Sequence, residues 1–212
     1  MCPDASPAFR FAIHADAPAL HALIELAYRG EAHGGWDSES HIFNAPRTSL
    51  EEVQSLIADE NSRFVMTELG GRIVACALIQ RARNVDGAIP GKASAPAYFG
   101  QQRAGEQPSA YFGQQRAGEQ PSAYFGMFAV DSSSRLAGVG KITLAECERQ
   151  VQEIWRARAL AMTVISLRET LIEWYGRRGY TRSGVRYPFP FSDKSGELRN
   201  DFDLVELKKT LS

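Results

Sequence analysis

Long apolar runs and an excess of positive charge are both missing from this sequence of 212 residues. No stretch approaches the roughly 18 consecutive apolar residues that cross a membrane. The first residues lack the cationic start and apolar stretch of a secretory signal. Lys and Arg number 24 against 25 Asp and Glu, so the net charge of −1 gives no sign of binding to nucleic acid or an anionic membrane. We therefore expect a cytoplasmic protein.

Cysteine and histidine are also scarce. The three cysteines, Cys2, Cys76 and Cys147, are scattered, which is typical of a reduced intracellular protein rather than of a disulfide framework. Cys76 and Cys147 lie in apolar patterns and are predicted to be small core residues. The four histidines show no pairing with cysteine or with one another at zinc-ligand spacing, so no metal site is expected.

An internal repeat is the most unusual feature that the sequence does have. Residues 97–109 (AYFGQQRAGEQPS) return unchanged at 110–122, and AYFG opens a third time at 123–126. Without these 26 residues the chain has 186, a length that suits one domain, and the 44 % hydrophobic composition of the whole chain allows a buried core. The whole chain is expected to form a single domain from which 97–122 protrude, between the third and fourth strands. Only Tyr124-Phe125-Gly126 leads into MFAVD, so this copy is predicted to form the strand.

Hydrophobic spacing predicts a chain of alternating strands and helices. Ser49 and Glu52 form a capping box at the start of the second helix, and Gly70-Gly71 between two apolar runs predicts a two-residue hairpin turn. The order β-α-α-β-β-β-α-β-α-β-β predicts a mixed α/β (α+β) sheet, partly antiparallel and partly parallel. Strands are expected at 9–13, 63–69, 72–80, 124–130, 161–165, 180–187 and 202–208, and helices at 16–29, 49–57, 140–157 and 168–178.

A glycine-rich loop, RLAGVGK at 135–141, lies between a buried strand and a long helix. N–H groups at a helix start lack intrahelical acceptors, and the helix dipole adds positive potential there. Gly138 and Gly140 let the backbone approach an anion, and Arg135 and Lys141 add positive charge, so a pyrophosphate fits this cradle. A Walker-type loop is disfavoured because Arg135 stands where it needs glycine and no Ser or Thr follows Lys141. The spacing does not fit a dinucleotide fingerprint either.

This loop and its surroundings resemble the GNAT superfamily of N-acyltransferases, which use acetyl-CoA. RLAGVG is similar to the family's Q/R-x-x-G-x-G/A loop, and LIEWYGRRGY to the end of its N-x-x-A-x-x-L-Y-x-x-x-G-F/Y segment. The resemblance covers about 8–208 by element order and is specific over 124–184. Two positions depart from the pattern, since Arg168 stands where the family has Asn and Leu171 where it has Ala.

The resemblance implies a mostly antiparallel central sheet flanked by helices, with a CoA site on it. Backbone amides of 136–141 would hold the pyrophosphate. The edge of strand 124–130 would pair with the pantetheine amides, and strand 161–165 would splay away to open a slot for the thioester. Arg168 would reach a CoA phosphate or the substrate. The residues implied at the CoA site are Phe128, Ala129, Val130, Arg135, Leu136, Ala137, Gly138, Val139, Gly140, Lys141 and Arg168.

The resemblance also implies direct attack on the acetyl carbonyl by a primary amine of a small molecule or peptide. Tyr175 would protonate the departing thiolate as general acid. Its placement matters more than its acidity, because a hydroxyl of pKa about 10 is a weaker acid than a thiol of pKa about 8.5. Strand 124–130 carries no acidic residue, so the general base cannot be assigned there. Glu31 and Glu39 are the candidates, and Glu68 on a strand is another.

The loop after the first helix is where such proteins usually recognise substrate. Tyr28, Trp36 and Glu39 are therefore the expected substrate-binding residues, and Arg47 is a further candidate for the pocket lining. Acetyl-CoA is the expected co-substrate, and a small-molecule or peptide amine is the expected partner. A homodimer is a possible assembly. The alternative is a non-catalytic acyl-CoA-binding or sensor domain of the same fold, suggested by the missing strand acid and by Arg168 in the Asn position.

Overall fold

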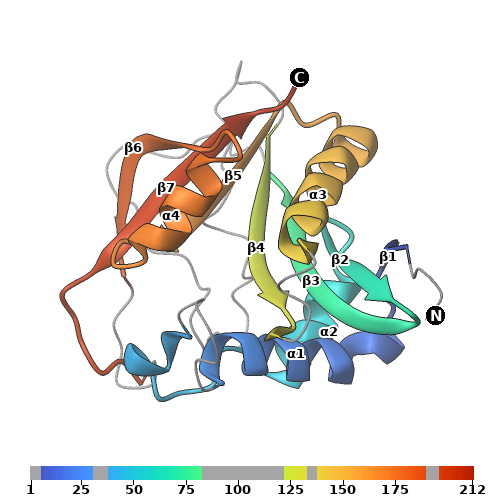
Figure 1. Cartoon of the computed structure of the whole chain (residues 1–212), viewed down its shortest axis with the longest axis horizontal. Helices are drawn as coiled ribbons and strands as arrows, with labels where there is room; N and C mark the ends of the chain where they lie inside the picture. Colours follow the sequence, from blue (N-terminus) through green and yellow to red (C-terminus); the bar gives the residue numbers. More distant parts are fainter. Residues whose placement is uncertain (1–5, 31–37, 83–121, 133–137, 190–195) are drawn as a thin grey trace.

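The computed structural model describes residues 6–30, 38–82, 122–132, 138–189 and 196–212, which surround one sheet (Figure 1). The strands are β1 (Ala8–Phe11), β2 (Ser62–Leu69), β3 (Arg72–Arg81), β4 (Ser122–Val130), β5 (Ala159–Ile165), β6 (Thr181–Pro188) and β7 (Asp203–Thr210). The α-helices are α1 (Ala17–Arg29), α2 (Leu50–Ala58), α3 (Val139–Trp155) and α4 (Glu169–Gly176). Short 3₁₀ turns lie at His14–Asp16 and Glu39–His41. The predicted order of strands and α-helices is confirmed.

The sheet is mixed and mostly antiparallel, as expected. Its strand order is β1-β2-β3-β4-β5-β7-β6. Each pairing of neighbouring strands is antiparallel except that of β4 with β5. The parallel pair follows from the long connection through α3, because a helical crossover returns the chain in the same direction.

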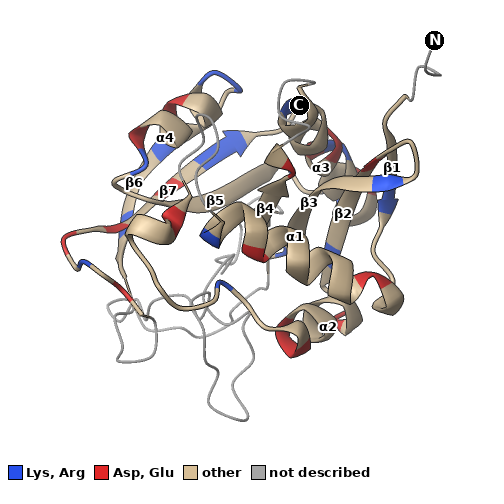
Figure 2. Cartoon of the chain, turned by 60° about the horizontal axis from the view of Figure 1, so that its bottom comes forward, with Lys and Arg blue, Asp and Glu red and all other residues tan. Residues whose placement is uncertain are grey.

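Helices cover both faces of the sheet (Figures 1 and 2). The side chains of β2 and β3 alternate between the two faces, as extended strands require. One core lies under α1 and α2 and includes Leu20, Ile24, Phe64 and Leu78. The other lies under α3 and α4 and includes Leu144, Cys147, Ile172, Val65 and Ile79. Cys76 and Cys147 are buried core residues as predicted, and burial raises the pKa of the Cys76 thiol to about 12.

The local signals in the sequence produce the turns and caps that they predict. Gly70 and Gly71 have φ angles of +59° and +77°, and they join β2 to β3 where Leu69 pairs with Arg72. Positive φ at both central residues suits the right-handed twist of a two-residue hairpin and favours glycine. At α2, the Ser49 hydroxyl accepts the amide hydrogen bond of Glu52 at 3.1 Å.

Several boundaries differ from the prediction by two residues, and among them β1 ends at Phe11 rather than at residue 13. The Asp16 carboxylate accepts the amide of Ile13 at 2.8 Å, and the Asp16 amide donates to the Ile13 carbonyl at 2.9 Å. These bonds form a turn that leaves Ile13 61 % exposed. The alternating pattern continues past the strand, but its last apolar residue does not reach the sheet.

The pairing of β4 with β5 is short, and the two strands then separate. It covers only Ser122–Tyr124 on β4 against Ala159–Ala161 on β5. β5 continues in full register with β7 to Ile165, while β4 continues along β3 with an irregularity opposite Cys76–Leu78. Met127, inside this irregular stretch, has a φ of +44°. The predicted splay of these strands is confirmed, and it opens a wedge in the middle of the sheet.

The third copy of the repeated AYFG sequence forms part of β4. Tyr124, Phe125 and Gly126 pair with Gln80, Ile79 and Leu78 of β3, so the predicted choice among the copies is confirmed. Residues 97–121 of the duplication lie outside the described residues.

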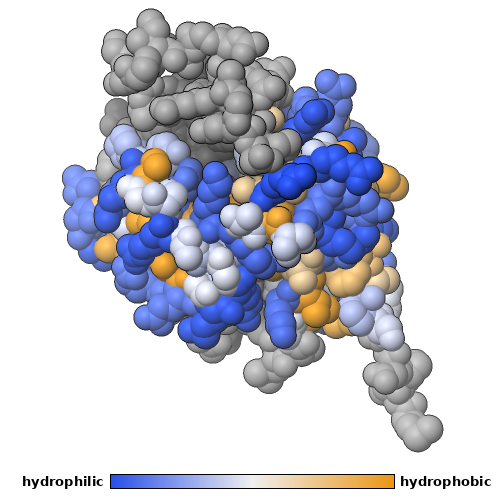
Figure 3. Space-filling view, turned by 90° about the horizontal axis from the view of Figure 1, so that it is seen from above, coloured by the Kyte–Doolittle hydropathy of each residue, from blue (hydrophilic) through white to orange (hydrophobic). Residues whose placement is uncertain are grey.

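The described surface carries both signs of charge, interleaved along α4, β6 and β7 (Figure 2). Arg182 pairs with Glu169 at 2.7 Å, and Arg186 with Asp203 at 2.5 Å. Exposed pairs of this kind contribute about 0–1 kcal/mol each. The face seen in Figure 3 is mostly hydrophilic with small apolar areas between. Within the described ranges, no helix is long and apolar enough to cross a membrane.

Candidate active site

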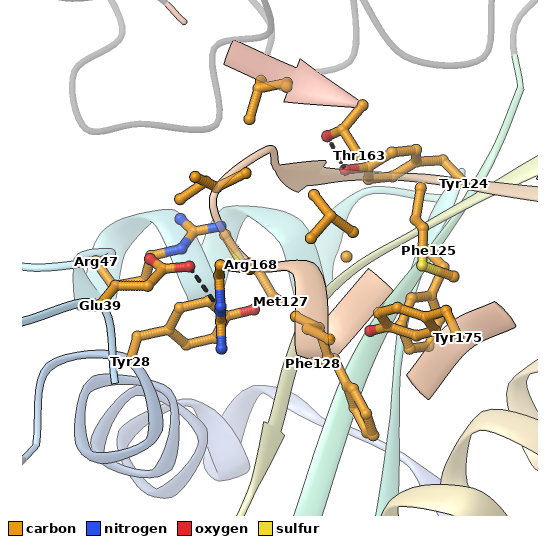
Figure 4. Close-up of a pocket in the computed structure, with 16 residues that line it drawn as sticks. Tyr28, Glu39, Arg47, Tyr124, Phe125, Met127, Phe128, Thr163, Arg168 and Tyr175 are labelled. Carbon is orange, nitrogen blue, oxygen red and sulfur yellow. Dashed lines mark hydrogen bonds and ion pairs between the residues drawn. The ribbon is translucent and has the colours of Figure 1, made fainter. Parts of the chain in front are cut away.

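A pocket opens where β4 and β5 separate, and its empty space together with open solvent at its mouth comes to about 590 Å³. Both strands contribute to its walls, and side chains from α1, α4 and the segment before α2 complete it (Figure 4). Across the wedge, the Tyr124 hydroxyl lies 3.2 Å from the hydroxyl of Thr163. The lining residues are Tyr28, Glu39, Arg47, Tyr124, Phe125, Gly126, Met127, Phe128, Met162, Thr163, Val164, Ile165, Arg168, Leu171, Tyr175 and Leu204.

Tyr175 reaches this pocket from α4. Its ring packs edge-on against Phe125, Trp174 and Tyr180, with centroids 6.3, 5.0 and 5.7 Å away. The residue is only 4 % exposed, and burial raises the pKa of its hydroxyl well above the usual value near 10. The hydroxyl is therefore protonated at physiological pH, and its ring is held rigidly at the wall of the pocket.

Glu39 forms the centre of a charged cluster on the other side of the pocket (Figure 4). One carboxylate oxygen accepts a hydrogen bond from Arg168 at 2.9 Å, and the other accepts one from Arg29 at 3.1 Å. Glu39 is 4 % exposed, so the carboxylate is buried between two guanidinium groups. Such charge-assisted bonds are among the stronger hydrogen bonds in proteins.

Arg47 and Tyr28 continue the cluster. The Arg47 guanidinium lies 5.0 Å from the centre of the Tyr28 ring, and Arg47 is 5 % exposed. Burial acts to lower the pKa of Arg47, but Tyr28 and Glu39 raise it, and the net shift is upward. The charge of Arg47 is therefore retained inside the wall. Burial raises the pKa of Tyr28, although the charge of Arg47 partly opposes the shift.

The segment that carries Glu39 and Arg47 is tied to α1 by hydrogen bonds. Arg29 donates from Nε to the carbonyl of Ala45 at 2.6 Å, and the Thr48 amide donates to Glu25 at 2.8 Å. These bonds position the buried cations relative to the helix. The two partners in each bond lie far apart in sequence. No local sequence pattern therefore predicts that this segment packs against α1.

The start of α3 is where the sequence predicts an anion cradle. Gly138 precedes the helix with a φ of +72°, and a side chain placed there would meet no atom within 4 Å. A Cβ at Gly140 would lie 3.4 Å from Phe128 and 3.6 Å from Trp174, so the first turn packs closely on the pocket's aromatic residues. The Lys141 amide donates to the Gly138 carbonyl at 3.0 Å, so a phosphate at this helix start would be bound by the backbone before Lys141.

The start of α3 is also tied to the sheet beneath it. The Thr143 hydroxyl donates to the Val139 carbonyl at 2.9 Å and lies 2.6 Å from the hydroxyl of Thr67 on β2. Both threonines are buried, so this contact fixes where the helix begins.

Among the described strands, none pairs with the edge of β4 that faces the wedge beyond Tyr124. Ala129 and Val130 pair with Cys76 and Ala75 of β3 on the other edge, and pairing with β5 has ended by then. A strand edge of this kind presents N–H and C=O groups to any extended amide ligand in the wedge.

The structure brings together several of the residues expected at the site. Tyr28, Glu39, Phe128, Arg168 and Tyr175 all line the pocket. Arg168, expected at the CoA site, contacts Glu39 beside the acceptor-side residues Tyr28 and Arg47. The expected residues Glu31, Trp36, Arg135, Leu136 and Ala137 lie outside the described residues.

Sequence reasoning missed Arg29 and Thr163. Arg29 is the last residue of α1 and looks like an ordinary cation at a helix C-terminus, yet it pairs with buried Glu39. Thr163 interrupts an apolar strand, which was the available signal for a polar contact in the wedge. Across the described ranges, no group of three or more His, Cys, Asp or Glu side chains is placed to hold a metal ion.

Comparisons with known proteins agree with this geometry. Among curated proteins, none matches the sequence significantly. A solved ribosomal-protein-alanine N-acetyltransferase from Brucella melitensis is 19 % identical with a TM-score of 0.59, over 96 % of this chain and 99 % of that one. An N-acetyltransferase from Staphylococcus aureus is 9 % identical with a TM-score of 0.62, over 98 % and 99 %. At such identities the likeness concerns the fold. The sequence profile of the acetyltransferase (GNAT) family matches residues 31–180, so the chain belongs to the GNAT acetyltransferase family.

Proposed function

We propose that this protein is an N-acetyltransferase that moves the acetyl group of acetyl-CoA to a primary amine of a small molecule or peptide. The observation that carries the proposal is the position of Tyr175, whose hydroxyl lies in the wall of a pocket opened by the separation of β4 and β5. Family membership supports acetyl transfer, and the pocket supplies a place where an acceptor and a thioester meet.

The residues present fit acetyl-CoA. The backbone at Gly138–Gly140 would receive the pyrophosphate, with open space at Gly138, while the Lys141 amide donates to the Gly138 carbonyl at 3.0 Å and would contribute through its side chain instead. Arg135, Leu136 and Ala137 would extend this cradle toward β4. The edge of β4 at Phe128–Val130, which pairs with no described strand on the wedge side, would pair with the pantetheine amides and so direct the thioester into the wedge.

The chemistry requires one bond to form and one to break. The unprotonated amine attacks the acetyl carbonyl, the C–S bond breaks, and the sulfur leaves with the electron pair. Tyr175 donates its proton to that sulfur. Its raised pKa makes full transfer to a free thiolate unfavourable, so the hydroxyl acts as a held donor whose hydrogen bond strengthens as negative charge develops on sulfur.

Glu39 suits a positioning role better than that of a general base. Both of its oxygens already accept hydrogen bonds from Arg29 and Arg168, and a proton taken from the amine would remove the charge that holds these two ion pairs together. We therefore assign Glu39 to the acceptor pocket, with Tyr28 and Trp36, and leave proton removal to Glu31 or to water.

The test is thiol release from acetyl-CoA in the presence of a broad panel of primary amines, with product mass measured in parallel. Acetylated amine and free CoA in equal amounts would support the proposal. Binding of CoA without turnover of any amine would favour a non-catalytic acyl-CoA sensor. That second function has one observation in its favour, namely that the carboxylate lining the described pocket is occupied by two arginines.

A further inference from the structure

We infer that Tyr124 restricts the acyl group that this protein transfers to a short one, acetyl or propionyl, because its side chain closes the narrow end of the wedge between β4 and β5. The inference rests on the proposed acetyl transfer and names the residue that discriminates among acyl-CoA donors. It follows from where the two strands stop pairing and from the side chains that lie at that point.

The wedge is narrowest where the pairing of β4 with β5 ends. Tyr124 is the last residue of β4 in that pairing, and it lies opposite Ala161 of β5. Thr163, two residues further along β5, pairs with Glu206 of β7 and with no described residue of β4. The gap beyond Tyr124 is therefore bridged by side chains rather than by a backbone ladder.

The Tyr124 side chain bridges this gap (Figure 4). Its hydroxyl lies 3.2 Å from the Thr163 hydroxyl on the opposite strand, and Tyr124 is 5 % exposed. A Cβ at Gly126 would lie 2.9 Å from Cε1 of the Tyr124 ring, so the ring lies back along β4 against Gly126. The contact with Thr163, the burial and the contact with Gly126 together hold the ring in one place.

Apolar side chains fill the other face of the sheet at the same level. Phe125 and Met162 belong to the core under α3 and α4 and are 1 % and 2 % exposed. Tyr124 belongs to the core under α1 and α2. All three line the pocket. Because neighbouring side chains of a strand point to opposite faces, the narrow end of the wedge is bounded from both sides.

The acyl group of a bound donor would point toward this end. The proposed CoA site begins at Gly138–Gly140 and follows the edge of β4 from Val130 to Phe128, which leads toward Tyr124. Gly126 lies two residues further, about 7 Å along an extended strand, and each methylene added to the acyl chain would carry it closer to the Tyr124 ring. Overfilling a packed site forces side chains or backbone to move. Acetyl and propionyl groups avoid this cost, and longer groups do not.

The first experiment compares acetyl-, propionyl-, butyryl- and hexanoyl-CoA as donors to one amine that the wild-type protein acetylates. We expect kcat/KM to be at least about 10-fold lower for butyryl-CoA than for acetyl-CoA, and lower again for hexanoyl-CoA. A single methylene in a pocket is enough to change this parameter about 10-fold or more. Equal kcat/KM for the four donors would overturn the inference and leave the proposed acetyl transfer intact.

Tyr124→Ala tests the assignment to this residue. The truncation opens the narrow end, so the ratio of kcat/KM for butyryl-CoA to that for acetyl-CoA should rise about 10-fold or more. Tyr124→Phe is the matched control, because it removes the contact with the Thr163 hydroxyl and keeps the ring. Tyr28→Ala removes a tyrosine ring from another part of the same pocket (Figure 4). Both controls should keep the wild-type ratio, whatever their effect on the rate.

Tyr124→Leu is the second variant, should Tyr124→Ala fail to fold. It keeps an apolar side chain but removes the part of the ring that reaches Thr163. A rise in the butyryl ratio in the truncated variants, with none in Tyr124→Phe, supports the inference. An unchanged ratio in the truncated variants, or an equal rise in Tyr124→Phe, overturns it.

A protein that transfers no acyl group from any of the four donors would contradict the proposed function, and the inference would then be tested by binding. The four thioesters are titrated calorimetrically into the wild-type protein and into Tyr124→Ala. Binding of hexanoyl-CoA to the wild type that is about 10-fold weaker than that of acetyl-CoA, with the difference lost in Tyr124→Ala, supports the inference. Equal binding of the donors to the wild type, or the same difference in both proteins, overturns it.

Discussion

Glu39 and Arg168 are 129 positions apart in the sequence, yet the Arg168 guanidinium donates to the Glu39 carboxylate at 2.9 Å in the wall of the pocket. The bond joins the 3₁₀ turn after α1 to the residue that precedes α4. It therefore links the acceptor side of the pocket to the helix that carries Tyr175.

Glu39→Gln should destabilise the protein strongly. The substitution leaves Arg29 and Arg168 buried without their counter-charge, which typically costs about 3 kcal/mol in the free energy of unfolding. Urea denaturation followed by circular dichroism measures the change. Glu153→Gln is the matched control, because Glu153 pairs with Arg149 at 60 % side-chain exposure and should change stability by about 0.5 kcal/mol or less. Equal effects of the two substitutions would contradict the structural role of Glu39.

Tyr175→Phe should reduce kcat by about 100-fold or more and leave the affinity for CoA nearly unchanged. The substitution removes the proposed proton donor but keeps the ring that packs against Phe125 and Trp174. Steady-state rates of thiol release and calorimetric titration with CoA measure the two effects. An unchanged rate would remove Tyr175 from the mechanism.

Tyr180→Phe is the control for that experiment. The Tyr180 hydroxyl donates to Glu148 at 3.0 Å, and Tyr180 is not among the residues that line the pocket. Its loss should lower stability by about 1–2 kcal/mol without changing kcat. A fall in kcat equal to that of Tyr175→Phe would mean that the rate reports general loosening of the aromatic cluster.

Gly138→Glu should abolish CoA binding. The new side chain would enter the open space beside the first turn of α3 and would place negative charge where the pyrophosphate is proposed to lie. Gly138→Ala is the control, because it brings the strain of a φ of +72° without bulk or charge, at about 1–2 kcal/mol of stability. Calorimetric titration with CoA measures both variants, and normal binding to Gly138→Glu would refute the cradle.

Removal of residues 97–121 should leave folding and CoA binding intact. The deletion keeps Ser122, whose carbonyl accepts the amide of Ala82 at 3.1 Å, and it keeps the copy of AYFG that forms β4. Thermal unfolding and CoA titration of the shortened chain, beside a chain that lacks only 97–109, measure the effect. A shortened protein that is unfolded or fails to bind CoA would show that the duplication belongs to the core of the domain.

The sequence by itself determined the elements, their order and the backbone turn before α3. Gly70-Gly71, the Ser49 cap and the glycine before α3 act through backbone conformation and hydrogen bonds within a few residues. Alternating and helical spacing likewise decided which side chains are buried. The motif around Tyr175 identified the family because its spacing lies within a single helix and its cap.

Only the tertiary structure decided how the acceptor side of the pocket is built. In the sequence, Glu39 was an acid in a polar loop, Arg29 a helix-terminal cation and Arg168 a departure from a motif, and no local rule pairs them. Folding brings them into one buried cluster. There the energy of each ion pair depends on the protein groups that replace water around it. Such interactions join the end of α1, the 3₁₀ turn after it and the start of α4. They form only when the folded sheet holds these segments close together.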